Sequence, residues 1–198
     1  MSDGEERLDA TLAGIDAANA ADPASEVIGG EERPAALLYS ERMTGWLARI
    51  EPEASDELCI AVRAQHIERW TMPRNGFPMN REGYLRWRSE LAKYHATRAG
   101  EIMVAAGYDA DAISRVDTLI RKRGIKRDPE VQTLEDVACL VFLENYFADF
   151  SAQHDEEKIV SIVAKTWAKM SERGHAAALT IDIPERAKAL VERALGDA

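Results

Sequence analysis

The sequence predicts an all-α protein, a bundle of about seven or eight helices. Apolar residues recur at spacings of three and four along most of the chain, as they do on one face of an α-helix. No run alternates β-branched and polar residues as a half-buried strand does. Proline, glycine and helix-capping residues separate the apolar stretches. These observations together favour helices packed on helices.

Three helices are expected in the first seventy residues. The first covers about 4–20, and the segment 22–33, rich in proline, glycine and glutamate, is expected to be a loop. The second helix follows Pro34 and carries an apolar stripe. Ser55 is a suitable N-cap for the third, which is expected to run through Trp70.

The middle of the chain predicts a long helix and a shorter one. Proline and glycine make 71–80 an irregular loop, and a long helix is expected over 81–105. The next helix begins at Asp109 and ends near Gly124, where a basic loop over 121–127 follows. Basic residues thus gather around the end of this helix.

The last third predicts the central helix. Thr133 is a candidate N-cap for a helix over 134–147 that is apolar almost all round, which is typical of a helix surrounded by others. Two further helices are expected over 156–172 and 184–195.

Composition indicates one globular domain. The chain has 198 residues, of which 46% are apolar and 30% charged, enough for one sizeable core and wrong for disorder. We expect a single domain over 1–198, with an N-terminal helix and loop over 1–33 that is mobile and a main bundle over 34–198. No apolar run has the length of a membrane span, and the acidic start lacks a signal region, so a cytoplasmic protein is expected.

The charge is unevenly distributed. The net charge is −10, yet residues 63–127 hold 14 Lys and Arg against 7 Asp and Glu, and the rest of the chain holds 11 against 28. An acidic surround repels nucleic acid, so nucleic acid is not an expected partner, whereas a basic segment within it suits a site for a small anionic substrate. The alternative is a solvated face whose cations pair with acidic neighbours. Oligomeric state stays open.

Two of the four histidines are expected within helices. His66 shares a predicted face with Cys59, Val62 and Trp70, and His95 lies on the long helix among apolar residues. Each histidine alone is commonly a core residue with satisfied hydrogen bonds. A pair on neighbouring helices favours convergence on one site, because bundle sites are built from facing helices.

Glu135 and Asp136 are expected at the first turn of the central helix. Carboxylates there stabilise a helix N-terminus, which is one explanation for them. However, Asp136 lies on the same stripe as apolar residues, and a buried carboxylate needs a partner or a metal ion. His66, His95 and Asp136 therefore form a candidate set of ligands for a divalent metal ion, with Glu135 as a further ligand or a general base.

The order of these residues resembles the HD-domain superfamily of all-helical, metal-dependent phosphohydrolases. Members carry ligands in the order His, His-Asp, Asp, and here the second element is His95-Ala96. The resemblance implies a divalent metal ion as cofactor and phosphohydrolase activity. Ala96 in place of the aspartate puts the metal in doubt.

A closer resemblance, covering most of residues 35–195, is to a family known as domain of unknown function 4202. Its members occur in bacteria, fungi and plants and are sometimes labelled glutamyl-tRNA synthetase-like. The similarity rests on four strings, which are RAQHIERW at 63–70, REGYLRWR at 81–88, LEDVACLVFLE at 134–144 and KTWAKMS at 165–171. The family implies no established activity, and no glycine-rich nucleotide-binding pattern supports the synthetase label.

Seven cations are candidates for phosphate binding, because Arg contacts phosphate through two parallel hydrogen bonds and Lys as a point charge. They are Arg69, Arg81, Arg88, Lys122, Lys126, Lys165 and Lys169. Two functions follow. One is a metal-dependent phosphohydrolase acting on a small phosphorylated metabolite or nucleotide. The other is a non-catalytic helical module that binds an anionic ligand, a protein or RNA in a basic groove.

Overall fold

The computed structural model describes residues 3–196, and this part of the chain is predominantly α-helical. The all-α prediction is confirmed. The helices are α1 Asp3–Asn19, α2 Ala35–Ile50, α3 Asp56–Arg63, α4 Arg81–Ala105, α5 Ala110–Ile120, α6 Pro129–Asn145, α7 Phe147–Ala152, α8 Glu156–Trp167, α9 Glu172–Ala178 and α10 Glu185–Gly196, with 3-10 turns η1 Arg69–Thr71 and η2 Arg74–Gly76.

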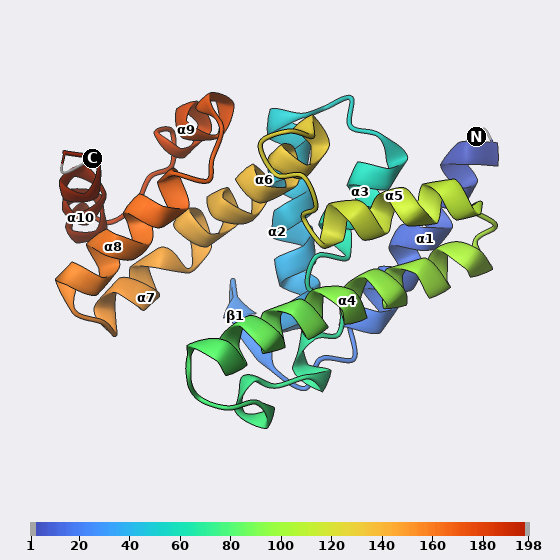
Figure 1. Cartoon of the computed structure of the whole chain (residues 1–198), viewed down its shortest axis with the longest axis horizontal. Helices are drawn as coiled ribbons and strands as arrows, with labels where there is room; N and C mark the ends of the chain where they lie inside the picture. Colours follow the sequence, from blue (N-terminus) through green and yellow to red (C-terminus); the bar gives the residue numbers. More distant parts are fainter. Residues whose placement is uncertain (1–2, 197–198) are drawn as a thin grey trace.

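The helix α6 is central, as its apolar sequence predicts. It packs against α2, α3, α5, α7 and α9, and Leu134, Val137 and Leu140 on it are fully buried. In Figure 1, α7, α8, α9 and α10 lie on the left and α1, α3, α4 and α5 on the right, with α2 and α6 between them. A helix buried on most sides has no water-facing stripe, which explains why its middle, from Val137 to Leu143, is wholly apolar.

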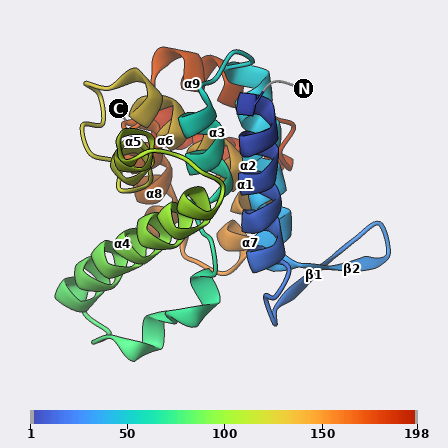
Figure 2. The same ribbon diagram turned by 90° about the vertical axis from the view of Figure 1, so that its right-hand side faces the viewer.

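The segment predicted as a loop over 22–33 contains a β-hairpin. Strands β1, Ser25–Ile28, and β2, Glu31–Pro34, pair antiparallel, and Figure 2 shows the hairpin projecting away from the helices. Gly29 and Gly30 form its two-residue turn with φ of 62° and 88°, a left-handed conformation that glycine adopts without steric cost. The strands are too short for apolar alternation to reveal them.

The third predicted helix ends earlier than expected. Ser55 caps α3 as predicted, through a hydrogen bond from the backbone N–H of Leu58, but the helix stops at Arg63. Glu68 has a φ of 50°, and its backbone N–H donates to Oδ1 of Asn19 on α1 at 3.1 Å. Residues 64–68 form turns, and the left-handed Glu68 is anchored to α1, so the prediction that His66 lies inside a helix is wrong.

The central helix begins earlier than expected. Asp128 caps α6 by accepting hydrogen bonds from the backbone N–H groups of Glu130 and Val131, and Pro129 occupies the first helical position. Thr133 is therefore not the cap, and Glu135 and Asp136 lie in the second turn. Their carboxylates are beyond the unsatisfied N–H groups of the first turn, so stabilising this helix N-terminus is not their role.

The region after α6 divides more finely than predicted. The short helix α7 follows α6, and the predicted helix over 156–172 is α8 followed by a turn into α9. Ser171 caps α9 by accepting a hydrogen bond from the backbone N–H of Gly174. Among the helices of the described residues, none has the length and apolar character to cross a lipid bilayer.

Candidate functional site

Three aromatic rings from three segments lie together. The Tyr39 ring, on α2, stacks on the His66 ring with centroids 4.3 Å apart and planes 18° apart. The His66 and His95 ring centroids are 6.0 Å apart, with planes tilted by 42°. The structure thus brings the two histidines together, as the sequence predicts, although His66 comes from a turn rather than a helix.

His95 has one ring nitrogen without a partner. Its side chain is 2% exposed, and Nδ1 lies 2.6 Å from the backbone carbonyl oxygen of Ile67. A carbonyl oxygen only accepts, so Nδ1 carries the proton and donates. Nε2 is then a lone-pair acceptor, and it is buried without a hydrogen-bond partner. Burial lowers the pKa of His95 to about 4, so the ring is neutral at neutral pH.

His66 is also held neutral. Burial lowers its pKa well below the ordinary value, and the positive charges of Arg69, Lys122 and Arg88 and the nearby ring of His95 lower it further. Each cation is close enough to His66 to act on its titration. Three cations therefore act on the neutral His66 ring, and Arg69 also acts on His95.

Arg69 and Arg88 lack carboxylate partners. The Arg69 guanidinium is half-buried over the ring of Trp87, 4.8 Å from its centroid, and no carboxylate of the described residues pairs with it. Burial lowers the pKa of Arg69, and Arg88 adds a like charge nearby. Arg88 is exposed on α4, 5.9 Å from the Tyr84 ring, and equally has no ion pair with a described residue. Salt bridges to acidic neighbours therefore do not account for these two arginines.

Glu135 is the carboxylate of this region. It is 7% exposed and pairs with the Nζ of Lys122, while the Nζ of Lys169 is 3.7 Å from its Oε1. Burial alone would raise the pKa of Glu135, but the charges of Lys122, Lys169 and Arg88 and the hydrogen bond from Lys122 lower it overall. Glu135 is therefore ionised at neutral pH.

We call this group of side chains the basic site. It consists of Tyr39, His66, Arg69, Arg88, His95, Lys122, Glu135 and Lys169. Arg69, Arg88 and Lys122 act on the neutral His66 ring, and Lys122, Lys169 and Arg88 act on the carboxylate of Glu135, so the group has an excess of positive charge. Such a site can bind an anion, and its imidazoles and Glu135 can accept protons or hydrogen bonds.

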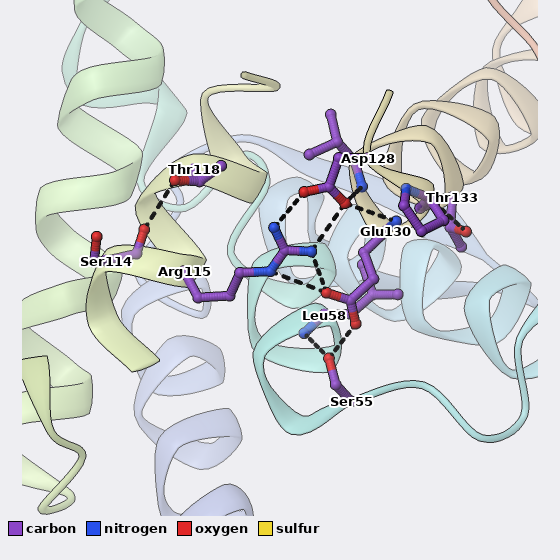
Figure 3. A network of polar contacts seen from close by, with 10 residues as sticks. Ser55, Leu58, Ser114, Arg115, Thr118, Asp128, Glu130 and Thr133 are labelled. Carbon is purple, nitrogen blue, oxygen red and sulfur yellow. Dashed lines mark hydrogen bonds and ion pairs between the residues drawn. The ribbon is translucent and has the colours of Figure 1, made fainter. Parts of the chain in front are cut away.

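The loop that carries Lys122 is held by a polar network. Arg115 on α5 pairs with Asp128 and Glu130 at the start of α6, and Glu130 accepts a hydrogen bond from the hydroxyl of Ser55 at 2.5 Å (Figure 3). The network joins both ends of the loop over 121–128. Within the loop, Lys122 has a φ of 53°, which costs energy in a residue with a Cβ.

The structure does not bring Asp136 into the basic site. Its carboxylate is fully buried and accepts three hydrogen bonds, from Gln132 Nε2 at 3.0 Å, from the backbone N–H of Ser171 at 2.9 Å and from Ser171 Oγ at 2.5 Å. Within residues 3–196 no three His, Cys, Asp or Glu side chains converge to hold a metal ion. The arrangement therefore does not fit the predicted three-ligand set, and the metal role of His66 and His95 stays a prediction.

Three of the predicted phosphate-binding residues lie outside the basic site. The Nζ of Lys126 donates to the backbone oxygen of Ala168 at 2.9 Å. Arg81 and Lys165 are exposed on α4 and α8, with no ion pair to a described residue. These three side chains stay untested as ligands for an anion.

A separate hollow of about 520 Å³ lies beside Asp136. Its lining includes the carboxylates of Glu51, Glu53 and Glu130 along with Arg173. So many carboxylates repel a phosphate group, which makes this hollow unsuited to the predicted anionic ligand.

The sequence reasoning missed Tyr39. No spacing relates Tyr39 to the histidines, since it is one of several apolar residues on the stripe of α2. The fold alone shows that this stripe faces His66.

The fold and the basic site define an all-α protein with a histidine pair near four cations, two of which have no ion pair with a described residue. The chain matches the family described as "Domain of unknown function (DUF4202)" over residues 9–191, and it belongs to that family. No curated protein and no solved structure matched the chain. The resemblance to this family is thus confirmed, and the HD-like arrangement stays a prediction.

Proposed function

We propose that the chain binds a small phosphorylated molecule in the basic site. The observation that carries the proposal is Arg69, whose guanidinium is half-buried and has no carboxylate partner among the described residues. A guanidinium withdrawn from water without a counter-ion is costly, and a bound anion offsets that cost.

The charge of the site supports a phosphate group in particular. Lys122 and Lys169 leave one unit of positive charge in excess after pairing with Glu135, and Arg69 and Arg88 add two more. A phosphate monoester carries nearly two negative charges at neutral pH, and its oxygens match the fork of an arginine. A carboxylate ligand would balance less of this charge.

The histidine pair adds hydrogen bonding without adding charge. Because Nε2 of His95 has a lone pair and no partner, it can accept a hydrogen bond from a hydroxyl or a water molecule beside the phosphate. Neutral imidazoles therefore let the site distinguish what the phosphate is attached to.

Isothermal titration calorimetry with inorganic phosphate and pyrophosphate tests this function. We expect wild type to bind, with an affinity that falls as salt rises. Arg69→Gln is expected to weaken binding about 10- to 100-fold, the loss of one charge-assisted contact. Arg86→Gln is the matched control, because Arg86 is exposed on α4 and has no ion pair to a described residue. Equal affinities for the two variants would contradict the proposal.

Hydrolysis of a phosphate ester in the same site is the second candidate function. The unprotonated Nε2 of His95 and the ionised Glu135 are two proton acceptors within one cationic site, which suits activation of water. A phosphate-release assay over nucleotides and sugar phosphates, with and without added Mn²⁺ or Mg²⁺, tests it. Release that disappears in both His95→Asn and Glu135→Gln supports hydrolysis, and no release under any condition leaves binding alone.

A further inference from the structure

Hydrogen bonds join the segment between α8 and α9 to the start of α6 and to the basic loop over 121–127. The backbone oxygen of Ala168 accepts from Lys126 Nζ at 2.9 Å, and that of Lys169 accepts from Gln132 Nε2 at 2.8 Å. Two residues further on, Ser171 donates both its N–H and its hydroxyl to Asp136. The backbone around Lys169 is therefore fixed on both sides.

Asp136 lies at the centre of these hydrogen bonds. Among the described residues it is the one carboxylate that contacts both Gln132 and Ser171, and so it orients the donor to Lys169 as well as the cap of α9. The fit is close, because a Cβ added to Gly174 would lie 2.8 Å from both Cγ and Oδ1 of Asp136. Glycine at 174 lets α9 approach the carboxylate.

These hydrogen bonds hold the backbone on either side of Lys169, whose ammonium lies near Glu135. Lys169 is half-exposed, and a long lysine side chain at the surface is normally free to sample many rotamers. With its backbone held, the Nζ of Lys169 lies 3.7 Å from Glu135 Oε1, and Lys169 has no ion pair with any other described carboxylate. The adjacent residues Glu135 and Asp136 on α6 thus contact different parts of the same segment. Glu135 lies near the side chain of Lys169, and Asp136 accepts hydrogen bonds from Ser171.

We propose that Asp136 is a positioning residue for the basic site, which holds Ala168–Ser171 so that the ammonium of Lys169 faces Glu135 and a bound phosphate group. The proposal rests on the proposed function for the phosphate, and on geometry alone for the Lys169–Glu135 pair. A purely structural role would make Asp136 stabilise α9 with no effect on Lys169.

A double-mutant cycle separates the two roles. We measure pyrophosphate affinity for wild type, Asp136→Asn, Lys169→Ala and the double variant. Lys169→Ala is expected to weaken binding about fivefold, as for a partly exposed ion pair. Asp136→Asn is expected to weaken it to a similar extent in wild type and to have no further effect when Lys169 is absent. Asp149→Asn is the matched control, since Asp149 is exposed and makes no ion pair with a described residue.

A second readout is independent of the ligand. The carboxyl carbon of Glu135, followed by NMR as pH is varied, reports its pKa. Lys169 lowers that pKa, so Lys169→Ala raises it, and Asp136→Asn is expected to raise it as well. An unchanged Glu135 titration in folded Asp136→Asn, or equal affinity losses in both backgrounds of the cycle, would overturn the proposal. Failure of wild type to bind pyrophosphate would instead contradict the proposed function while the Glu135 titration still decides the role of Asp136.

Discussion

Nδ1 of His95 lies 2.6 Å from the backbone carbonyl oxygen of Ile67, and this contact decides the chemistry of the whole ring. It places the proton on Nδ1 and leaves Nε2 as a buried acceptor. It also joins α4 to the turn that carries His66, whose ring lies beside that of His95 in the basic site. Burial and the charge of Arg69 lower the pKa of His95 and so keep the ring neutral, although the hydrogen bond to Ile67 acts in the opposite direction.

The stability of the protein should fall as pH is lowered through the range of His95. Its pKa is lowered from 6.5 to about 4, so the unfolded chain binds the proton first. The stabilisation is therefore complete above pH 6.5 and is lost as pH falls towards 4, by about 3 kcal/mol. Urea unfolding of wild type and His95→Asn at several pH values measures this difference. Parallel pH dependences for the two proteins would show that His95 does not titrate in this way.

Replacing Gly174 by alanine should disturb the contact between α9 and α6. The new Cβ would lie 2.8 Å from Asp136, and relieving that overlap should cost about 1–3 kcal/mol of unfolding free energy. Gly45→Ala is the control, because nothing lies within 4 Å of a Cβ at that helical position and alanine favours a helix. Thermal denaturation of both variants measures the contrast. A stable Gly174→Ala protein would argue against the close packing.

Arg115 should stabilise the loop that bears Lys122. Its hydrogen bonds to Asp128 lower the pKa of that carboxyl to about 2. In Arg115→Met we expect this pKa to return towards 3.8 and the protein to lose about 1–3 kcal/mol. Arg193→Ala, which removes an exposed pair with Glu156, should change stability by less than about 1 kcal/mol. Chemical denaturation and NMR titration provide the two measurements, and similar losses in both variants would contradict the expectation.

Glu135→Gln should bind phosphate more tightly than wild type. The change removes the carboxylate that neutralises Lys122 and Lys169, so both ammonium groups become available to the anion. We expect a gain of about fivefold or more in affinity by calorimetry. If phosphate release occurs in wild type, the same variant should lose it, because a proton acceptor is gone. Weaker phosphate binding in Glu135→Gln would place the anion elsewhere.

Local signals predicted most of the helices. Ser55 and Asp109 cap helices where the sequence suggests, because an N-cap depends on a few neighbouring residues. The turn that follows α3 could not be found in this way, since at Glu68 it contacts Asn19, which lies far away in the sequence. The hairpin at Gly29 and Gly30 was missed because its strands are short and exposed.

The candidate site was predicted only in part, because it too depends on contacts between residues far apart in the sequence. His66 and His95 do meet, and Lys122 and Lys169 do flank Glu135. Asp136 shares a helix with Glu135, but consecutive helical residues point about 100° apart, so its carboxylate contacts α9 instead. Spacing along one helix shows which residues share a face and does not show which neighbour that face meets.

The proposed binding of a phosphate group in the basic site is tested most directly by NMR of the four histidine rings. Inorganic phosphate is titrated into the labelled protein, and each ring is assigned by substitution. We predict that the ring resonances of His66 and His95 shift in a saturable manner, while those of His154 and His175, which contact Phe150 and Trp167, stay unchanged. Saturating phosphate that leaves His66 and His95 unmoved, or shifts all four rings alike, would contradict the account.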